Sequence, residues 1–311
     1  MTDKWMWLNY HHLLYFALVV EEGGIAAAAA RLGVSHPTIS EQIKRLEAQL
    51  KVQLFERRGR RLQLTEDGKL VHDHAKELFG VGAALMEAIE ARRLGRNLVA
   101  RIGVDSVLAK LLVRQILAPM LDATGTDLQF RCVEDEREYL IEKLVTRRLD
   151  VVLTDATTEL HESSVQTDLL MTSPIAFFAA PILQERLHGA FPACLNDAPL
   201  LVPLAMTRLR RDIERWIVDL DLHPRIVGEV ADSGLLKALG QDGRGIFAMP
   251  SAVAGEIERQ YGVTRIGNAE NIEARVLAMT TDVSRDNPAI KALLAVRSRP
   301  DSMQRKKRSR E

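Results

Sequence analysis

The chain has 311 residues, of which 47% are hydrophobic and 27% charged, and its 42 basic residues balance 42 acidic ones. This length allows one small module beside a larger body, and the composition excludes a disordered, collagen-like or disulfide-stapled protein. With only Cys132 and Cys194, we expect a reduced, cytoplasmic protein in which both cysteines are small buried side chains.

Two short helices are predicted at the start of the chain. Apolar residues at helical spacing predict a helix over residues 9–22, which Gly23 and Gly24 end, and an alanine-rich helix over Ile25–Leu32. The apolar run Leu13–Val20 is much shorter than the roughly 18 residues that a membrane span needs. Glu21 and Glu22 separate this run from the small residues behind it, which argues against a signal peptide. We therefore expect no contact with a membrane.

A third helix follows a short turn. Ser35 is placed to cap it, and Pro37 falls in its first turn, where a missing N–H does no harm. At about 100° per residue, one face of this helix is apolar, and its residues are Ile39, Ile43, Leu46 and Leu50. The opposite face carries short polar and basic groups, as in a helix-turn-helix whose second helix enters the major groove. The alternative is an ordinary solvated helix with a Glu41–Arg45 ion pair.

The next residues predict a two-stranded hairpin. Residues 54–65 read as strand, glycine turn and strand, with four arginines near the turn: Arg57, Arg58, Arg60 and Arg61. Arginines on a narrow turn neutralise phosphates or enter a minor groove. The whole stretch Lys44–Arg61 holds seven basic residues against two acidic ones, which suits a polyanion.

This pattern resembles the winged helix-turn-helix of LysR-type transcriptional regulators. The matching residues are Ala28, Ala29, Leu32, Ser35, Ile39, Ser40, Gln42, Ile43, Leu46, Glu47, Leu54, Phe55, Arg57, Leu64, Thr65 and Gly68. The resemblance implies that residues 1–64 bind an operator in double-stranded DNA. It places these residues at base edges: Ser35, His36, Pro37, Thr38, Ser40 and Glu41. As basic contacts to DNA we add Lys44, Arg45, Arg58, Arg60 and Arg61. Many members have arginine where this chain has Glu41, and a carboxylate favours a cytosine amino group over guanine.

Residues 65–94 predict one long helix. Thr65 is a suitable N-cap, and the helix should run to about Arg93. A heptad seam lies along it, made of Val71, Ala75, Leu78, Gly82, Leu85 and Ile89. Such a narrow apolar stripe is typical of a helix that pairs with the same helix of a second copy of the chain. The family resemblance likewise implies a dimerising linker helix, hence a homodimer or homotetramer on a two-fold related operator.

Residues 95–297 alternate strands with helices, which predicts an α/β body with parallel strands. The predicted strands are Leu98–Val104, Leu128–Val133, Val151–Thr154, Ile175–Ala180, Leu200–Pro203, Ile226–Val230, Ile246–Met249 and Val276–Thr280. The resemblance implies two α/β subdomains like those of a periplasmic binding protein, with a small effector in the cleft between them. The crossovers between subdomains are expected near residues 158–170 and 265–272.

Several strand ends carry carboxylates, and ligands in such sheets bind off the carboxyl ends of strands. The candidate effector residues there are Asp105, Ser106, Glu134, Asp135 and Asp155. Clustered carboxylates suit a hard cation. The alternative is helix capping by Asp105 and Asp135, which needs no ligand.

A closer resemblance within the family is to an activator of a sodium/proton antiporter gene. It rests on residues 9–13, 55–60, 130–132, 134, 191–195 and 236–238. It implies an activator that responds to sodium and pH, with Asp105, Glu134 and Asp155 as candidate sodium ligands. Other members of the family bind small organic anions, for which Ser106, Thr207 and Arg208 would serve. The resemblance also implies RNA polymerase as a partner: effector binding would change the closure of the two subdomains and thereby the contact of the regulator with the polymerase.

Other classes of function are less well supported. Nothing indicates an enzyme or a cofactor: Gly240–Gly245 lacks phosphate-loop spacing, and His72 and His74 cannot share a helix face. A solute-binding transport protein is the alternative of another class, but it would be exported and would lack a DNA-binding head. The last segment, residues 298–311, is predicted to be a basic disordered tail.

Overall fold

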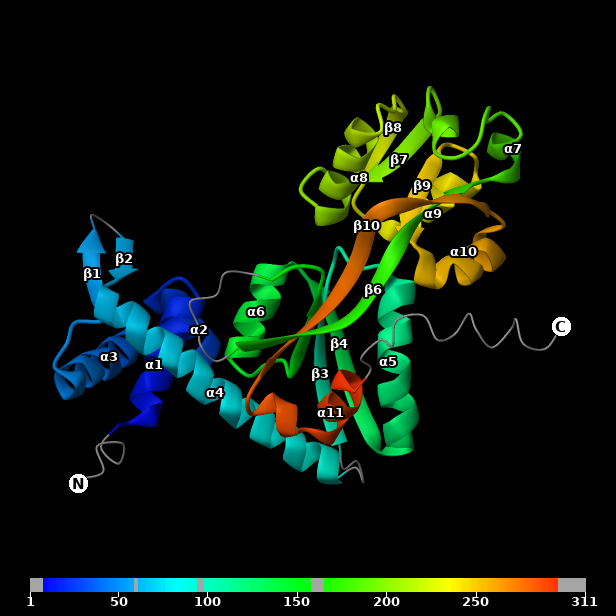
Figure 1. Ribbon diagram of the computed structural model, residues 1–311. Coiled ribbons are helices and arrows are strands. Elements are labelled where there is room, and N and C mark those ends of the chain that lie inside the picture. Colours follow the sequence, from blue (N-terminus) through cyan, green and yellow to red (C-terminus); the bar gives the residue numbers. More distant parts are fainter. Residues whose placement is uncertain (1–7, 59–60, 94–97, 158–164, 296–311) are drawn as a thin grey trace. The chain divides into compact units, whose positions relative to one another are not determined.

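The computed structural model describes residues 8–58, 61–93, 98–157 and 165–295 (Figure 1). The chain forms two compact units, the first made of residues 1–87 with 146–148 and the second of residues 88–145 with 149–311. Arg60, the predicted tail 298–311 and part of the first predicted crossover lie outside the described residues.

The first unit contains the three predicted short helices and the predicted hairpin. Its elements are α1 Tyr10–Glu21, α2 Ile25–Leu32, α3 His36–Leu50, β1 Phe55–Arg58 and β2 Arg61–Leu64. Asn9 caps α1 by accepting hydrogen bonds from the N–H groups of His11 and His12. Gly33 ends α2 in the left-handed region, at φ 66°, where glycine has no steric penalty. The helix and hairpin predictions for this segment are confirmed.

An apolar core holds the first unit together. Its fully buried side chains come from all three helices and from the start of the hairpin: Phe16, Ala28, Ile39, Leu46 and Leu54. Phe16 packs edge-on against Phe55 of β1, with ring centroids 5.3 Å apart. Burial of these side chains is the main stabilising contribution. Among the described residues no single helix is long and apolar enough to cross a membrane; α1 and α2 pass such a test only when joined across their 119° bend.

The long helix α4 spans Glu66–Arg93, as predicted. The Thr65 hydroxyl accepts a hydrogen bond from the Gly68 N–H and donates one to the Gln53 carbonyl oxygen. Gly68 leaves no room for a side chain, because a Cβ there would lie 2.1 Å from the Leu54 carbonyl oxygen. This close approach joins the start of α4 to the hairpin.

The second unit is built on a mixed eight-stranded sheet. Its strands are β3 Leu98–Asp105, β4 Leu128–Asp135, β5 Val151–Thr154, β6 Val165–Ala179, β7 Pro199–Pro203, β8 Arg225–Val230, β9 Ile246–Pro250 and β10 Thr264–Thr281. Their order in the sheet is β4-β3-β5-β10-β6-β9-β7-β8. The helices are α5 Lys110–Thr124, α6 Arg137–Val145, α7 Pro181–Gln184, α8 Arg208–Asp219, α9 Ser233–Gln241, α10 Ala254–Tyr261 and α11 Pro288–Leu294.

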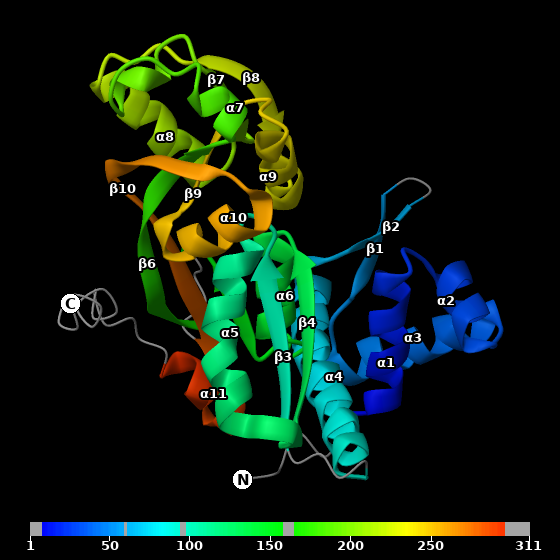
Figure 2. The same cartoon turned by 90° about the vertical axis from the view of Figure 1, so that its right-hand side faces the viewer.

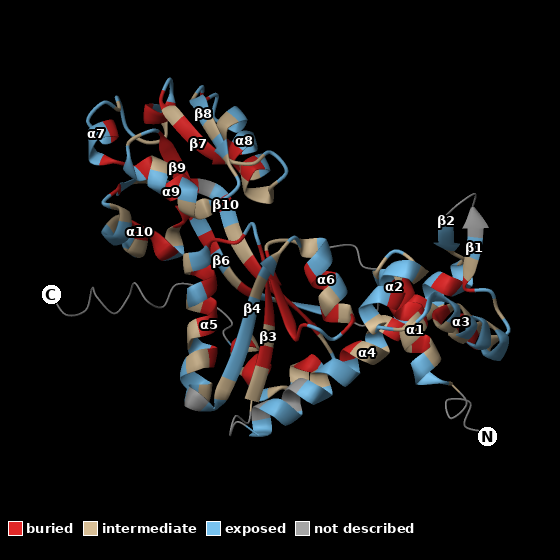
Figure 3. Ribbon diagram, turned by 180° about the vertical axis from the view of Figure 1, so that it is seen from behind, coloured by how far each residue is buried: buried red, intermediate tan, exposed pale blue. Residues whose placement is uncertain are grey.

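Two lobes of this unit share the long strands β6 and β10 (Figures 1 and 2). We call them subdomain I, with β3, β4, β5, α5, α6 and α11, and subdomain II, with β7, β8, β9 and α7 to α10. In subdomain I, α5 and α11 pack together and α6 packs on β3, β5 and β10. Figure 3 shows the buried residues concentrated on the strands and on the inner faces of the helices.

The long strands correct two expectations. The sheet is mixed, because β6 and β10 run antiparallel to each other and to β9 and β5. The strands predicted at 175–180 and 276–280 are parts of longer ones: β6 and β10 pass from one lobe to the other as continuous strands of 15 and 18 residues, and both overlap the ranges predicted for the two crossovers. Their register shifts between Ala269 and Glu273 of β10, opposite Pro174 of β6. Proline has no N–H to donate, so a break in the ladder is expected there.

The cysteines differ from expectation in one respect. Cys194 is buried as predicted, but Cys132 is exposed on β4. Since β4 lies at the edge of the sheet, most of its side chains face solvent.

Candidate nucleic-acid interface and ligand cleft

The start of α3 is held rigidly. Ser35 accepts a hydrogen bond from the Thr38 N–H at 3.3 Å, and the Ser35 and Thr38 hydroxyl oxygens lie 2.8 Å apart. Below this turn Ile39, Ile43 and Leu46 are buried in the core of the first unit. The other side of α3 is therefore fixed outward: Ser35, His36, Pro37, Glu41, Lys44 and Arg45 are exposed, and Thr38 and Ser40 are half-buried.

Glu41 and Arg45 form an ion pair on this outer face. Both side chains are 60% exposed, so the pair contributes little to stability, about 0.3 to 0.5 kcal/mol for such an i,i+4 pair. The pair predicted for an ordinary solvated helix is thus present. It leaves both groups accessible to a ligand that competes for them.

The hairpin is tied to α3 through Glu47. Its carboxylate accepts hydrogen bonds from the backbone N–H groups of Leu54, at 2.8 Å, and Phe55, at 3.4 Å. β1 and β2 pair in register from Phe55 opposite Leu64 to Arg58 opposite Arg61. The Arg58 and Arg61 side chains, like all of Arg60, lie outside the described residues. The backbone nevertheless places Arg58 and Arg61 as the last described pair at the turn end of the hairpin.

The predicted pairing seam of α4 is divided in two. Ala75 is completely buried in the core of the first unit, and Val71 packs against the same core. These two positions are a correction, because their side chains already have partners within the chain. Leu78 is half-buried, whereas Leu85 and Ile89 are exposed. Val81 and Met86 are also exposed there, so the apolar surface available to a second copy lies toward the C-terminal end of α4.

A pocket of about 80 Å³ lies between subdomains I and II. Its walls are mainly apolar, with Leu108 and Leu112 from subdomain I and Leu236 and Met249 from subdomain II. Its polar lining residues are Asp155, Thr207, Arg208, Ser233, Glu273 and Arg275. We call it the cleft pocket. Apolar walls with a few convergent polar groups are typical of a small-molecule site.

Arg137, which the sequence did not single out, lies between two of the carboxylates predicted at the strand ends, those of Asp105 and Asp155. The Arg137 Nε donates to Asp105 Oδ2 at 2.9 Å and to the Thr154 hydroxyl at 2.8 Å, while another guanidinium N–H donates to Asp155 Oδ1 at 2.7 Å. Thr154 itself donates to Asp105 at 2.7 Å. Asp105 is only 2% exposed, so Arg137 supplies the positive charge that this buried carboxylate requires.

The other predicted effector residues lie apart from the cleft pocket. Glu134 forms an ion pair with Lys110, and Asp135 pairs with Lys143 while accepting from the Glu136 N–H. Ser106 is exposed and donates its backbone N–H to the Asp135 carbonyl oxygen. Of the seven residues predicted for either effector, Asp155, Thr207 and Arg208 line the pocket. Thr207 caps α8 by accepting from the Arg210 N–H at 3.2 Å.

The described residues contain no group of three or more His, Cys, Asp or Glu side chains arranged to hold a metal ion. Asp105 and Asp155 are brought together, but around Arg137, and Glu134 stands with a different cation. One sequence signal pointed to this arrangement. Arg137 is the first residue of α6, where the helix dipole disfavours a positive charge, so a nearby carboxylate was to be expected.

The cleft pocket should make stability depend on pH through Asp155. Burial raises the pKa of Asp155, with Arg137 opposing and Asp105 adding to the shift. The folded protein then holds this proton more tightly than the unfolded chain. This side chain therefore makes the free energy of unfolding fall as the pH rises from 3.8 through its raised pKa.

We expect Asp155→Asn to remove this decrease in the free energy of unfolding with rising pH. Urea unfolding at a series of acidic pH values measures it. Asp135→Asn is the matched control with the opposite sign. Hydrogen bonding to Lys143 lowers the pKa of Asp135, so its contribution grows as the pH rises. Equal slopes in the unmodified protein and Asp155→Asn would contradict the assignment.

Family comparisons cover both units. Residues 10–69 match the bacterial regulatory helix-turn-helix protein, lysR family, and residues 95–297 match the LysR substrate binding domain. The chain is 30% identical over 287 residues to the transcriptional activator protein NhaR of Escherichia coli, covering 92% of this chain and 94% of that protein.

Two solved structures share the fold. One is full-length CbnR complexed with its target DNA, with a TM-score of 0.62, 19% identity, and coverage of 93% of this chain and 99% of that one. The other is ArgP from Mycobacterium tuberculosis, with a TM-score of 0.64, 20% identity, and coverage of 94% and 98%. The helix-turn-helix with its hairpin and the two-lobed α/β body thus follow each other along the chain in the same order as the two family matches. The chain belongs to the LysR family of transcriptional regulators, and it is a regulator rather than an enzyme.

Proposed function

We propose that this protein is a transcriptional activator that binds operator DNA as an oligomer and is controlled by a small ligand in the cleft pocket. The observation that carries the DNA-binding proposal is the outer face of α3. This face is polar and basic and largely exposed, while the apolar residues on the opposite face of the helix are buried in the core. The similarity to an E. coli protein named as a transcriptional activator supports activation.

The proposal assigns residues 1–64 to DNA binding, 65–94 to a linker helix, 95–297 to the effector domain and 298–311 to a basic tail. In the DNA-binding part, the start of α3 reads bases and the hairpin arginines contact the backbone. Leu85 and Ile89 of α4 contribute to the contact between two copies, since both are exposed apolar side chains on one helix. Ligand-driven closure of the subdomains would then alter DNA bending and contact with RNA polymerase.

Removing a base contact and removing a phosphate contact should reduce DNA affinity in different ways. Thr38→Ala should cost about 1 to 3 kcal/mol on the selected operator and nothing on random DNA. Lys44→Ala should weaken binding to both and reduce the salt slope by about one. Gln49→Ala, exposed at the far end of α3, is the control. The measurement is affinity at several salt concentrations, on random DNA and on an operator selected from a random pool. A Thr38→Ala loss of the same size on both DNAs would refute the base-contact assignment.

Two effector classes remain open, and the geometry favours an organic anion. Arg208 and Arg275 line the cleft pocket, while Arg137 already occupies the carboxylates proposed as sodium ligands. A response to sodium and pH is supported by the similarity to NhaR and by the raised pKa of Asp155. For sodium to bind Asp105 and Asp155, it would have to displace the Arg137 guanidinium.

One experiment separates the two effectors. Melting of the full-length protein is followed in NaCl, LiCl and KCl at equal ionic strength, and with a panel of carboxylates as potassium salts. A ligand that binds only the folded state raises the melting temperature. We expect a carboxylate to raise it and Arg275→Gln to remove that rise. A rise specific to sodium that Asp155→Asn removes and Asp135→Asn leaves unchanged would establish the cation instead.

A further inference from the structure

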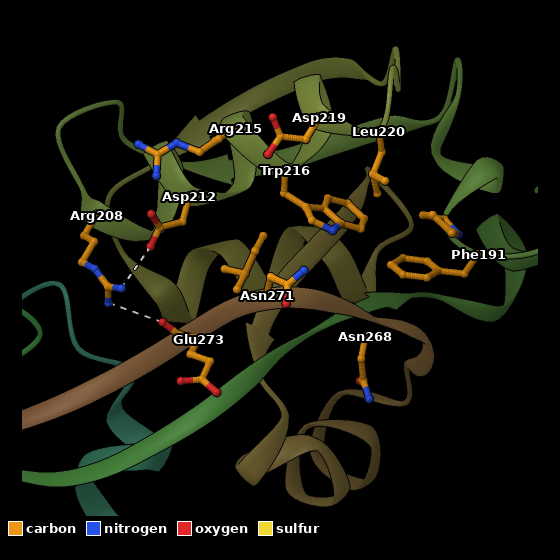
Figure 4. Close-up of a pocket in the computed structure, with 12 residues that line it drawn as sticks. Phe191, Arg208, Asp212, Arg215, Trp216, Asp219, Leu220, Asn268, Asn271 and Glu273 are labelled. Carbon is orange, nitrogen blue, oxygen red and sulfur yellow. Dashed lines mark hydrogen bonds and ion pairs between the residues drawn. The ribbon is translucent and has the colours of Figure 1, made fainter.

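Subdomain II contains a second, larger pocket. It has a volume of about 960 Å³ and lies between α8 and the bend of β10 (Figure 4). We call it the outer pocket. Phe191 and Trp216 line one side, and the charged residues of α8 and the amides of β10 line the rest. A volume near 1,000 Å³ is within the range of small-molecule sites, about 300 to 1,000 Å³.

An irregularity of β10 shapes this pocket. Between Ala269 and Glu273 the strand leaves its register with β6, and Asn271 adopts a left-handed φ of 65°. Bulges of this kind redirect side chains and are frequent beside binding sites. Asn268 and Asn271 both line the pocket as a result. Neither side chain has a hydrogen-bond partner within the part of the chain that the structure describes.

The aromatic side of the pocket is a packed cluster of three rings. Trp216, Phe177 and Phe191 form one cluster, in which the Trp216 ring centroid lies 5.4 Å from that of Phe177 and 5.8 Å from that of Phe191, and the two phenylalanine centroids lie 5.5 Å apart. Gly267 packs against Phe191, because a Cβ there would lie 2.3 Å from the ring. The Trp216 Nε1–H has no acceptor among the described residues, and Figure 4 shows this nitrogen on the side of Asn271.

Both signs of charge are available on α8. Arg208 pairs with Asp212 at 3.4 Å, which neutralises that end of the pocket. Arg215 and Asp219 are four residues apart, yet within the described chain neither has an ion-pair or hydrogen-bond partner. The Glu273 carboxylate extends away from α8 (Figure 4). The face toward the pocket thus offers one unpaired cation and one unpaired anion beside neutral amides.

We propose that the outer pocket is a second ligand site that takes a zwitterion of α-amino-acid type, from a single amino acid to a short peptide. The ligand ammonium group is held by Asp219, and its carboxylate is held by Arg215 and the Trp216 N–H. The amides of Asn268 and Asn271 supply both donors and acceptors for a peptide group. A zwitterion can pair with both exposed α8 groups, whereas a ligand with a single charge can pair with only one of them and therefore gains less from the pocket.

This site is placed to influence the cleft pocket. Arg208 and Glu273 line both pockets, and Arg208 donates to the Glu273 carbonyl oxygen at 3.4 Å. A ligand in the outer pocket that shifts Arg208 or the β10 backbone at Glu273 therefore changes the lining of the cleft pocket as well. By linkage, an anion in the cleft pocket must change zwitterion binding by the same factor as the zwitterion changes anion binding.

Trp216 provides a direct readout. The chain has three tryptophans, at positions 5, 7 and 216, so the variant Trp5→Phe/Trp7→Phe leaves Trp216 as the sole one. The probes are leucine and trileucine, with leucinamide, N-acetyl-leucine and N-acetyl-leucinamide as matched ligands that lack one or both charges. We expect a saturable change of Trp216 fluorescence with the two zwitterions and at least tenfold weaker binding of the blocked ligands. Equilibrium dialysis of labelled leucine against the unmodified full-length protein gives a second measurement independent of tryptophan.

Variants then locate the site. Asp219→Asn and Arg215→Gln should each weaken leucine binding at least tenfold. Arg211→Gln, exposed on α8 but not lining the pocket, and Arg275→Gln, in the cleft pocket only, should leave it unchanged. Loss of binding in Arg275→Gln with retention in Asp219→Asn would place the ligand in the cleft and overturn the proposal. Equal binding of leucine and N-acetyl-leucinamide, or no saturable binding in either assay, would also overturn it.

Discussion

Phe16→Ala is expected to lower the free energy of unfolding of the first unit by about 3 to 5 kcal/mol. Phe16 is fully buried between the helices and contacts Phe55 of the hairpin, so its removal leaves a cavity that these elements cannot fill. The loss should unfold the DNA-binding unit and abolish operator binding. Because the two units need not unfold together, hydrogen exchange of amides in α1 and α3 is the appropriate measurement.

The control for this variant removes the same side chain from a solvated site. Phe130 is 46% exposed on β4, so Phe130→Ala should change stability much less than Phe16→Ala. Amides of the second unit should keep their protection in Phe16→Ala. If protection in α1 and α3 were equal in the two variants, the core assigned to the first unit would be wrong.

Arg137→Met is expected to destabilise the second unit by about 3 to 5 kcal/mol. The substitution removes the cation from Asp105, whose side chain is 3% exposed, and leaves a buried carboxylate that has only neutral partners among the described residues, the Thr154 hydroxyl and the Val107 N–H. Urea unfolding followed by hydrogen exchange of β3 and β5 measures this loss. The double variant Arg137→Met/Asp105→Asn should recover part of it, because the unpaired charge is then gone.

Lys143→Met is the matched control on the same helix. Lys143 also pairs with an aspartate, but the two side chains are 38% and 37% exposed, so its loss should cost less than about 1 kcal/mol. Arg137→Met also tests the sodium hypothesis, since it leaves Asp105 and Asp155 without their cation. Stabilisation of this variant by sodium over potassium would show that the two carboxylates can hold the ion. Equal stability of Arg137→Met and the unmodified protein would contradict the role of the ion pair.

Local patterns in the sequence were enough to predict the first unit. Helical spacing, the Ser35 cap and the Gly33 exit act over a few residues, and they produced α1 to α4 and the hairpin with bounds within about two residues. The apolar stripe of α3 likewise settled which face is buried, because that face follows from the 3.6-residue period. The family resemblance rested on these same local features.

Contacts between distant segments decided the rest. The lengths of β6 and β10 depend on pairing with each other across about 100 residues, for which no local periodicity exists. Val71 and Ala75 match the heptad as well as Leu85 does, and only the packing of α1 to α3 shows that Ala75 is already buried. The sequence placed Asp105 and Asp155 at neighbouring strand ends. That Arg137 lies between them follows from the packing of α6, since electrostatic partners are selected by distance in space and not along the chain.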